Sequence, residues 1–135
     1  AAAYLVKDMS EIERVRSMRD RLESEILDKI PKSRLNGTSD PANRLPNTSN
    51  ISFENTNGES ILARLDDLGV CVSTGSACNA TDHSVSPVLQ AMNIPFIQAM
   101  GSIRFSLGRY NTKEEVDFVL ENARKIVEEI RAVAG

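Results

Sequence analysis

The residue best suited to covalent chemistry is Cys78, which lies in a run of small residues at positions 74–80. Small polar side chains cannot build a core, so we expect this run to be a loop with an accessible thiol. A nucleophilic thiol needs such access, together with room for the atom it attacks. Few apolar anchors from residue 74 to about 84 predict the most mobile internal segment. An ordinary surface cysteine is the alternative, because unperturbed thiols are mostly protonated at neutral pH.

Cys71 has a different setting. It stands between Val70 and Val72 in a β-branched run that is typical of a buried strand over residues 70–73. Burial raises the pKa of a thiol, so we expect Cys71 to be inert core filler. Two cysteines are too few for a disulfide framework, and we expect both thiols to be free.

The second candidate for chemistry is Arg104, in the alternating segment SIRFSL at residues 102–107. Alternation places Ile103, Phe105 and Leu107 on a core face, and Arg104 with two serines on a polar face. A guanidinium on a rigid strand can hold a carboxylate through two parallel hydrogen bonds. The alternative is a structural ion pair with an acid from elsewhere in the chain. Arg109, in a turn after Gly108, is expected to be solvated.

The single histidine, His83, could in principle activate a thiol or bind a metal. A zinc site needs about four ligands at defined spacing, however, and this chain offers two cysteines and one histidine. We therefore expect no metal. The five lysines lie in or beside charged helical faces and are expected to be ordinary surface residues: Lys7, Lys29, Lys32, Lys113 and Lys125.

The elements that must position these residues follow from periodicity and from turn residues. Apolar residues at intervals of three and four predict helices over residues 8–30, 58–68 and from about 113 to the end, with a shorter helix after Pro87. Pro31 and Gly69 should end the first two helices, and Thr112 with Glu115 has capping-box spacing. Strands are predicted around residues 34–35, 51–53, 70–73 and 102–107. Pro95 is expected to close the region before the last strand.

Composition limits the class of protein. A chain of 135 residues with 41% hydrophobic content fits one domain over residues 1–135, and 4% aromatic content suits helices on a small sheet. The predicted fold is therefore α/β, with three or four strands covered by helices. The net charge of −3 comes from charges spread along the chain, which argues against a nucleic-acid partner. Membrane-length apolar runs and signal-peptide features are missing, so we expect a cytoplasmic protein without membrane association.

Four blocks together resemble the C-terminal part of the cysteine desulfurases of the NifS and IscS type. They are RLPNTSNISF (residues 44–53), GESIL (58–62), STGSAC (73–78) and SIRFSLGR (102–109). Four blocks in register are far harder to obtain by chance than one short motif.

This resemblance implies a fold like that of the C-terminal domain of fold-type I pyridoxal phosphate enzymes. Cysteine desulfurases take sulfur from L-cysteine, giving L-alanine and a persulfide on an enzyme cysteine, which matches Cys78. Arg104 matches the arginine that binds the substrate carboxylate. The segment after Cys78 resembles the long form of the NifS and IscS group, which implies an arm that carries sulfur to an iron–sulfur scaffold or another acceptor. The resemblance also implies a homodimer.

One departure from the family pattern concerns the cofactor lysine, which in these enzymes follows a histidine. Here His83 precedes Ser84, and none of the lysines has such neighbours. We therefore expect the large cofactor-binding domain, and pyridoxal phosphate with it, to lie outside this chain. The chain alone should then bind no cofactor and turn over no cysteine. Two alternatives remain open: a sulfur-acceptor or scaffold-binding module without catalysis, and an enzyme like selenocysteine lyase.

Overall fold

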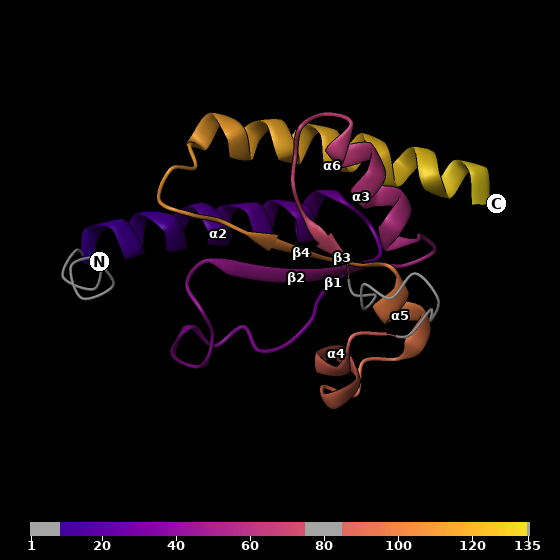
Figure 1. Ribbon diagram of the computed structural model, residues 1–135, viewed down its shortest axis with the longest axis horizontal. Helices are drawn as coiled ribbons and strands as arrows, with labels where there is room; N and C mark the ends of the chain where they lie inside the picture. Colours follow the sequence, from indigo (N-terminus) through magenta and orange to yellow (C-terminus); the bar gives the residue numbers. More distant parts are fainter. Residues whose placement is uncertain (1–8, 75–84, 135) are drawn as a thin grey trace.

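The computed structural model describes residues 9–74 and 85–134 (Figure 1). The helices in this part are α2 (Met9–Lys29), η1 (Pro41–Asn43), α3 (Gly58–Asp66), α4 (Pro87–Ala91), α5 (Phe96–Met100) and α6 (Lys113–Ala134). The strands are β1 (Ser33–Leu35), β2 (Thr48–Phe53), β3 (Ser73–Thr74) and β4 (Ser102–Ser106).

The four strands form one antiparallel sheet in the order β1-β2-β4-β3. The central pair has five cross-strand partners, among them Asn50 with Arg104 and Ser52 with Ser102. The edge strand β3 pairs through two residues only, Ser73 with Arg104 and Thr74 with Ile103. Arg104 therefore lies between β2 and β3, with a partner on each side.

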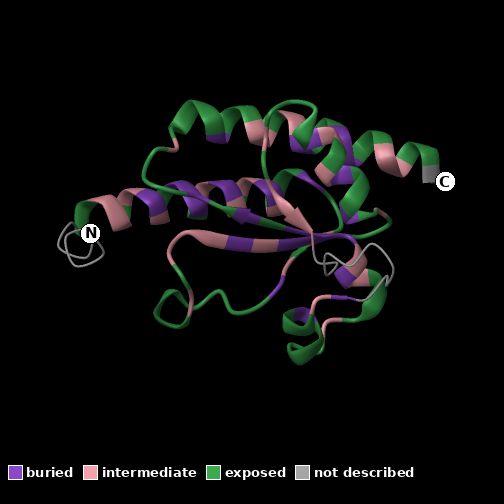
Figure 2. Cartoon of the chain, in the orientation of Figure 1, coloured by how far each residue is buried: buried purple, intermediate pink, exposed green. Residues whose placement is uncertain are grey.

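The helices α2, α3 and α6 lie on one face of the sheet (Figure 1). They bury an apolar core against the inward residues of the central strands. Figure 2 shows in purple the buried residues of these helices and of the sheet. The largest fully buried apolar members of the core include Ile26, Ile51, Phe53, Ile103 and Val127. This arrangement confirms the α/β class and the small helix-covered sheet predicted from the sequence.

The short helices α4 and α5 lie on the opposite side of the sheet (Figure 1). They share a small apolar cluster of Val85, Leu89 and Ala99. Pro95, expected only to close this region, is the residue from which α5 begins. Proline suits a helix start because its missing N–H is one that the first turn leaves unpaired.

Local signals account for the helix ends. The Glu115 backbone N–H donates to Thr112 Oγ1 at 3.2 Å, and the Thr112 N–H donates to Glu115 Oε2 at 3.1 Å, so the predicted capping box is formed. Gly69 follows α3 with φ of +79°, a conformation that other residues adopt only with strain. The helix α2 ends at Lys29, two residues before Pro31.

Candidate carboxylate-binding site

Arg104 lies on the sheet face turned away from α2 and α6. The strand alternates as predicted, because Ile103 and Phe105 are buried while Arg104 and Ser106 are exposed. Ser102 lies on the predicted polar face but is fully buried. The polar face of β4 is therefore covered at one end and open at Arg104.

A row of three polar side chains crosses the sheet at Arg104. Asn50 of β2 stands opposite it on one side and Ser73 of β3 on the other. Arg104 Nη2 donates a hydrogen bond to Ser73 Oγ at 3.2 Å. Across the described residues, every ion pair within 4.0 Å uses another basic side chain, so the alternative of a structural ion pair for Arg104 is not found there. The guanidinium is exposed, and it has further N–H groups besides the one that binds Ser73.

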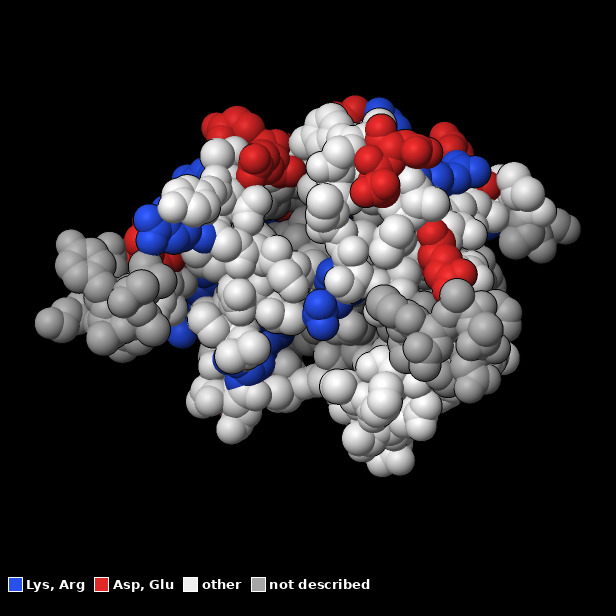
Figure 3. All heavy atoms as spheres, viewed as in Figure 1, with Lys and Arg blue, Asp and Glu red and all other residues white. Residues whose placement is uncertain are grey.

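The charge distribution favours an anion at this place. In the view of Figure 3, acidic side chains gather mainly over α6 and α3, whereas basic and uncharged side chains cover the region over the sheet. A basic side chain such as Arg104 in a region with few acidic neighbours suits a carboxylate better than a cation.

A buried polar cluster supports this face and was missed by the sequence analysis. Asn36 is 7% exposed, and its Nδ2, which has two hydrogens, lies 2.7 Å from Asn50 Oδ1, 2.7 Å from Ser52 Oγ and 3.0 Å from Ser102 Oγ. Ser102 Oγ donates to the Gln98 carbonyl at 3.0 Å, which ties α5 to the sheet. The available signal was small polar residues at alternate positions of β2 and β4, where a solvent-exposed face would carry longer side chains.

Cys71 is exposed, so the prediction that it is buried core filler is wrong. The regular strand begins at Ser73, not at residue 70, and Val70 and Val72 pack against the core on either side of Cys71. Side chains of an extended chain alternate between faces, so two inward valines send the residue between them outward. β-branched neighbours indicated the extended backbone correctly but not the side on which the thiol lies.

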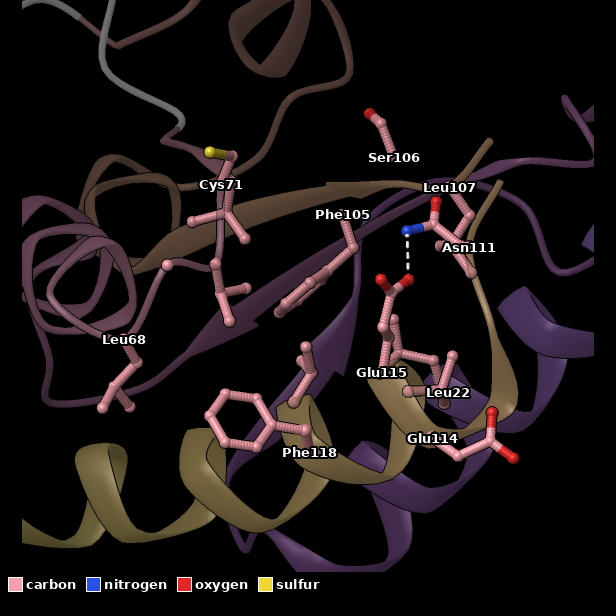
Figure 4. Close-up of a pocket in the computed structure, with 15 residues that line it drawn as sticks. Leu22, Leu68, Cys71, Phe105, Ser106, Leu107, Asn111, Glu114, Glu115 and Phe118 are labelled. Carbon is pink, nitrogen blue, oxygen red and sulfur yellow. Dashed lines mark hydrogen bonds between the residues drawn. The ribbon is translucent and has the colours of Figure 1, made fainter. Parts of the chain in front are cut away.

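The exposed Cys71 lines an open apolar groove between α6 and the segment leading to β3 (Figure 4). Phe105, Leu107 and Phe118 contribute apolar walls, and Glu115 reaches toward Asn111 at one end. The apolar walls of the groove face the helix layer, whereas the Cys71 side chain points away from α6 (Figure 4). By alternation Cys71 lies on the same side as Ser73, the strand partner of Arg104.

The remaining sequence candidates have different outcomes. Cys78 and His83 lie outside the described residues, as does the predicted mobile segment apart from Thr74. Arg109 is exposed, as expected, with its guanidinium carbon 4.8 Å from the centre of the Tyr110 ring. In residues 9–74 and 85–134, no group of three His, Cys, Asp or Glu side chains suits a metal ion. No helix in the same ranges is long and apolar enough to cross a membrane.

The described lysines do not fit a pyridoxal phosphate site. Lys29 and Lys125 form surface ion pairs with Glu25 and Glu121, each at 2.6 Å, and Lys32 and Lys113 are also exposed. A lysine that forms a covalent bond with a carbonyl cofactor must be desolvated so that its amine is uncharged, which an exposed helical or turn position does not provide. Lys7 lies outside the described residues.

The fold is that of NifS-like enzymes. A solved NifS-like protein superposes with a TM-score of 0.74 at 31% identity, over 92% of this chain and 30% of that protein. The family model for class-V aminotransferases matches residues 1–119, and the chain belongs to this family.

Curated relatives with higher sequence identity support the same family. A cysteine desulfurase of Azotobacter chroococcum is 43% identical over 99% of this chain and 33% of its own length. The cysteine desulfurase NifS of Azotobacter vinelandii is 46% identical over 89% of this chain and 29% of its own length. The chain thus spans about a third of the length of the curated relatives it matches.

Proposed function

We propose that this chain is the small C-terminal domain of a cysteine desulfurase, in which Arg104 binds the carboxylate of L-cysteine and Cys78 accepts its sulfur. The observation that carries the proposal is the exposure of the Arg104 guanidinium and the kind of groups around it. This guanidinium is exposed on a rigid central strand, beside hydroxyl and amide groups and without a described acid to neutralise it. Similarity to curated cysteine desulfurases supports L-cysteine as the substrate.

The proposed chemistry is a transfer of sulfur to a thiolate. The Cys78 thiolate attacks the substrate sulfur, an S–S bond forms as the C–S bond breaks, and the substrate carbon takes up a proton and leaves as L-alanine. Stabilising the electron pair on that carbon is the chemistry of pyridoxal phosphate, whose covalent attachment the exposed described lysines do not suit. In this proposal a part of the enzyme outside residues 9–74 and 85–134 holds that group.

The connectivity of the chain supports the assignment of Cys78. β3 pairs with β4 at Arg104, and Cys78 is the fourth residue after Thr74, where β3 ends. Four residues span at most about 14 Å. Arg104 and Cys78 are thus connected through one short strand pairing, which is compatible with one group binding the substrate and the other taking its sulfur.

The persulfide on Cys78 is then passed to an acceptor, an iron–sulfur scaffold or another sulfur-carrier protein, and the working enzyme is a homodimer. The same proposal predicts that residues 1–135 by themselves convert no cysteine, because cofactor and lysine are supplied elsewhere.

The test uses the complete enzyme that contains this chain, with alanine and sulfide measured as products. Arg104→Ala should raise KM for L-cysteine at least tenfold, since charged hydrogen bonds of about 1.5–3 kcal/mol are lost. Arg109→Ala, which removes an exposed arginine five positions on, is the matched control and should leave KM unchanged.

Cys78→Ser should still bind substrate but transfer no sulfur to an acceptor protein. Sulfur transfer that survives in Cys78→Ser, or a wild-type enzyme that releases no alanine from cysteine, would overturn the proposal. A strong preference for selenocysteine over cysteine would instead identify a selenocysteine lyase.

A further inference from the structure

The hydroxyl of Ser102 determines how the buried amide of Asn36 is oriented. Ser102 Oγ has one hydrogen, which it donates to the Gln98 carbonyl at 3.0 Å. Toward Asn36, 3.0 Å away, Ser102 Oγ can then only accept, so the amide atom facing it must be the nitrogen Nδ2. The Asn36 oxygen Oδ1 accepts from Gln98 Nε2 at 3.1 Å. The single hydrogen of Ser52 Oγ serves either Asn36 Oδ1 at 3.0 Å or Ser102 Oγ at 2.8 Å, and both partners can accept it in this orientation.

This orientation determines that of Asn50 in turn. Asn36 Nδ2 lies 2.7 Å from the Asn50 side chain, so the Asn50 atom facing it must be the acceptor Oδ1. The Asn36 backbone N–H also donates to the Asn50 carbonyl at 2.8 Å, which holds the two residues together at two points. The Asn50 amino group, Nδ2, is left facing away from the buried cluster. Among the described residues, the hydrogen bond to the Asn50 side chain uses Oδ1, and none is found for Nδ2.

Asn50 and Arg104 are direct cross-strand partners on the same face of the sheet. Side chains in such pairs have Cβ atoms about 4.5–5.5 Å apart. An amide N–H and a guanidinium N–H are both donors, so the two groups cannot satisfy each other. Both remain available to a ligand that supplies acceptor oxygens, and the half-buried Asn50 brings its donor with little loss of side-chain freedom.

We propose that Asn50 is a second substrate-binding residue, whose Nδ2 donates to the same carboxylate that Arg104 binds, with Asn36 as the residue that positions it. This inference rests on the proposed function, because the carboxylate is that of the amino-acid substrate. Ser102, Ser52 and Gln98 act through Asn36 and do not touch the substrate. The buried cluster thereby connects α5 to the binding of substrate.

Asn50→Asp in the complete enzyme is the sharpest test. Aspartate keeps the oxygen that Asn36 needs, so the cluster and the fold are retained, but it replaces the donor by a negatively charged acceptor beside Arg104. KM for L-cysteine should rise at least tenfold with kcat changed less than threefold, since binding and not the chemical step is affected. Asn50→Ala, which removes the donor without adding charge, should raise KM about tenfold, as expected for one hydrogen bond to a charged group.

Two inhibitors supply a measurement that a merely structural role would not change. Inhibition by L-alanine, which has the carboxylate, should weaken in Asn50→Asp as much as KM rises. Inhibition by ethylamine, which lacks the carboxylate, should be unchanged. Thr48→Val is the matched control, because Thr48 lies two residues away on the same strand face with similar burial, and it should alter neither constant.

The outcomes separate this inference from the proposed function. A wild-type enzyme that forms no alanine from cysteine contradicts the proposed function itself. An active wild-type enzyme whose KM and L-alanine inhibition are unchanged in Asn50→Asp contradicts the role of Asn50 alone. Equal weakening of both inhibitors, or an equal effect of Thr48→Val, also contradicts it, because a general disturbance of β2 would then be responsible.

Discussion

Arg44 and Glu23 form a bidentate ion pair, with Nη1 to Oε1 at 3.0 Å and Nη2 to Oε2 at 2.6 Å. The two side chains are 11% and 12% exposed, and Ser49 Oγ donates to the same carboxylate at 2.6 Å. Arg44 also donates to the Thr48 carbonyl at 3.2 Å. The pair joins α2 to the segment that leads into β2, the strand that carries Asn50.

Loss of the arginine should destabilise the fold. Arg44→Met leaves the Glu23 charge largely buried without its partner, and we expect the free energy of unfolding to fall by about 2 kcal/mol in urea denaturation. Arg21→Met is the control, because the side chains in the ion pairs of Arg21 with Asp117 and Glu25 are 26% to 57% exposed, well above those of Glu23 and Arg44, and these pairs should matter far less. Equal losses in the two variants would show that burial of the pair adds nothing.

Glu23 should make the free energy of unfolding depend on pH in the acidic range. Burial opposes its ionisation, but the hydrogen bonds from Arg44 and Ser49 outweigh this effect and hold the pKa of Glu23 below its usual value. A carboxyl with a lowered folded pKa contributes stability above its unfolded pKa of about 4.3, and this contribution is lost as pH falls through the folded pKa. The difference in unfolding free energy between wild type and Glu23→Gln should therefore shrink below about pH 4. A difference that stays constant from pH 7 to pH 3 would contradict this.

Cys71 should react in the native protein. Its thiol is exposed, so alkylation should proceed without unfolding, as followed by mass spectrometry of the intact labelled protein. Cys71→Ser should change the unfolding free energy by no more than about 0.5 kcal/mol, as surface substitutions do. Sulfur transfer in the complete enzyme should persist in Cys71→Ser and be lost in Cys78→Ser. Protection of Cys71 until denaturant is added would contradict its exposed position.

Gly101 should not tolerate a side chain. A Cβ at this position would lie 2.4 Å from the Phe53 carbonyl oxygen, a backbone atom that cannot turn aside. The backbones of the same two residues are also joined by a hydrogen bond from the Phe53 N–H to the Gly101 carbonyl at 2.9 Å. We expect Gly101→Ala to cost about 2 kcal/mol in thermal or urea unfolding. In Gly108→Ala the nearest atom is 3.9 Å away, and stability should be unchanged or slightly raised.

Sequence periodicity was sufficient for most of the fold because the relevant interactions are local. The capping box of Thr112 and Glu115 and the alternation around Arg104 each depend on residues within a few positions of one another. The side on which Cys71 lies could also have been read from its two valine neighbours, had alternation been applied to residues 70–73 as it was to β4. The error lay in treating a β-branched run as buried on both faces.

The cluster around Asn36 could not be predicted in the same way. It joins a residue after β1 to β2, to β4 and to α5, and Asn36 and Ser102 are 66 positions apart. Asparagine before glycine is a turn signal in sequence, which indicates a loop at Asn36 and gives no sign of a buried side chain. Only the antiparallel register, which places Ser52 opposite Ser102, brings these groups to one point.

The alternation of β2 has a consequence for how the chain can change over evolutionary time. A slip of one residue against β4 would turn Ile51 and Phe53 toward the polar cluster and Asn50 and Ser52 toward the apolar core. Such a slip is unfavourable on both faces of the sheet. Natural selection should therefore remove insertions or deletions of a single residue within this strand. A shift of two residues keeps both faces, but it places Thr48 or Ser52 opposite Arg104. Hydroxyl-bearing residues are thus the replacements that register shifts can bring to the place of Asn50.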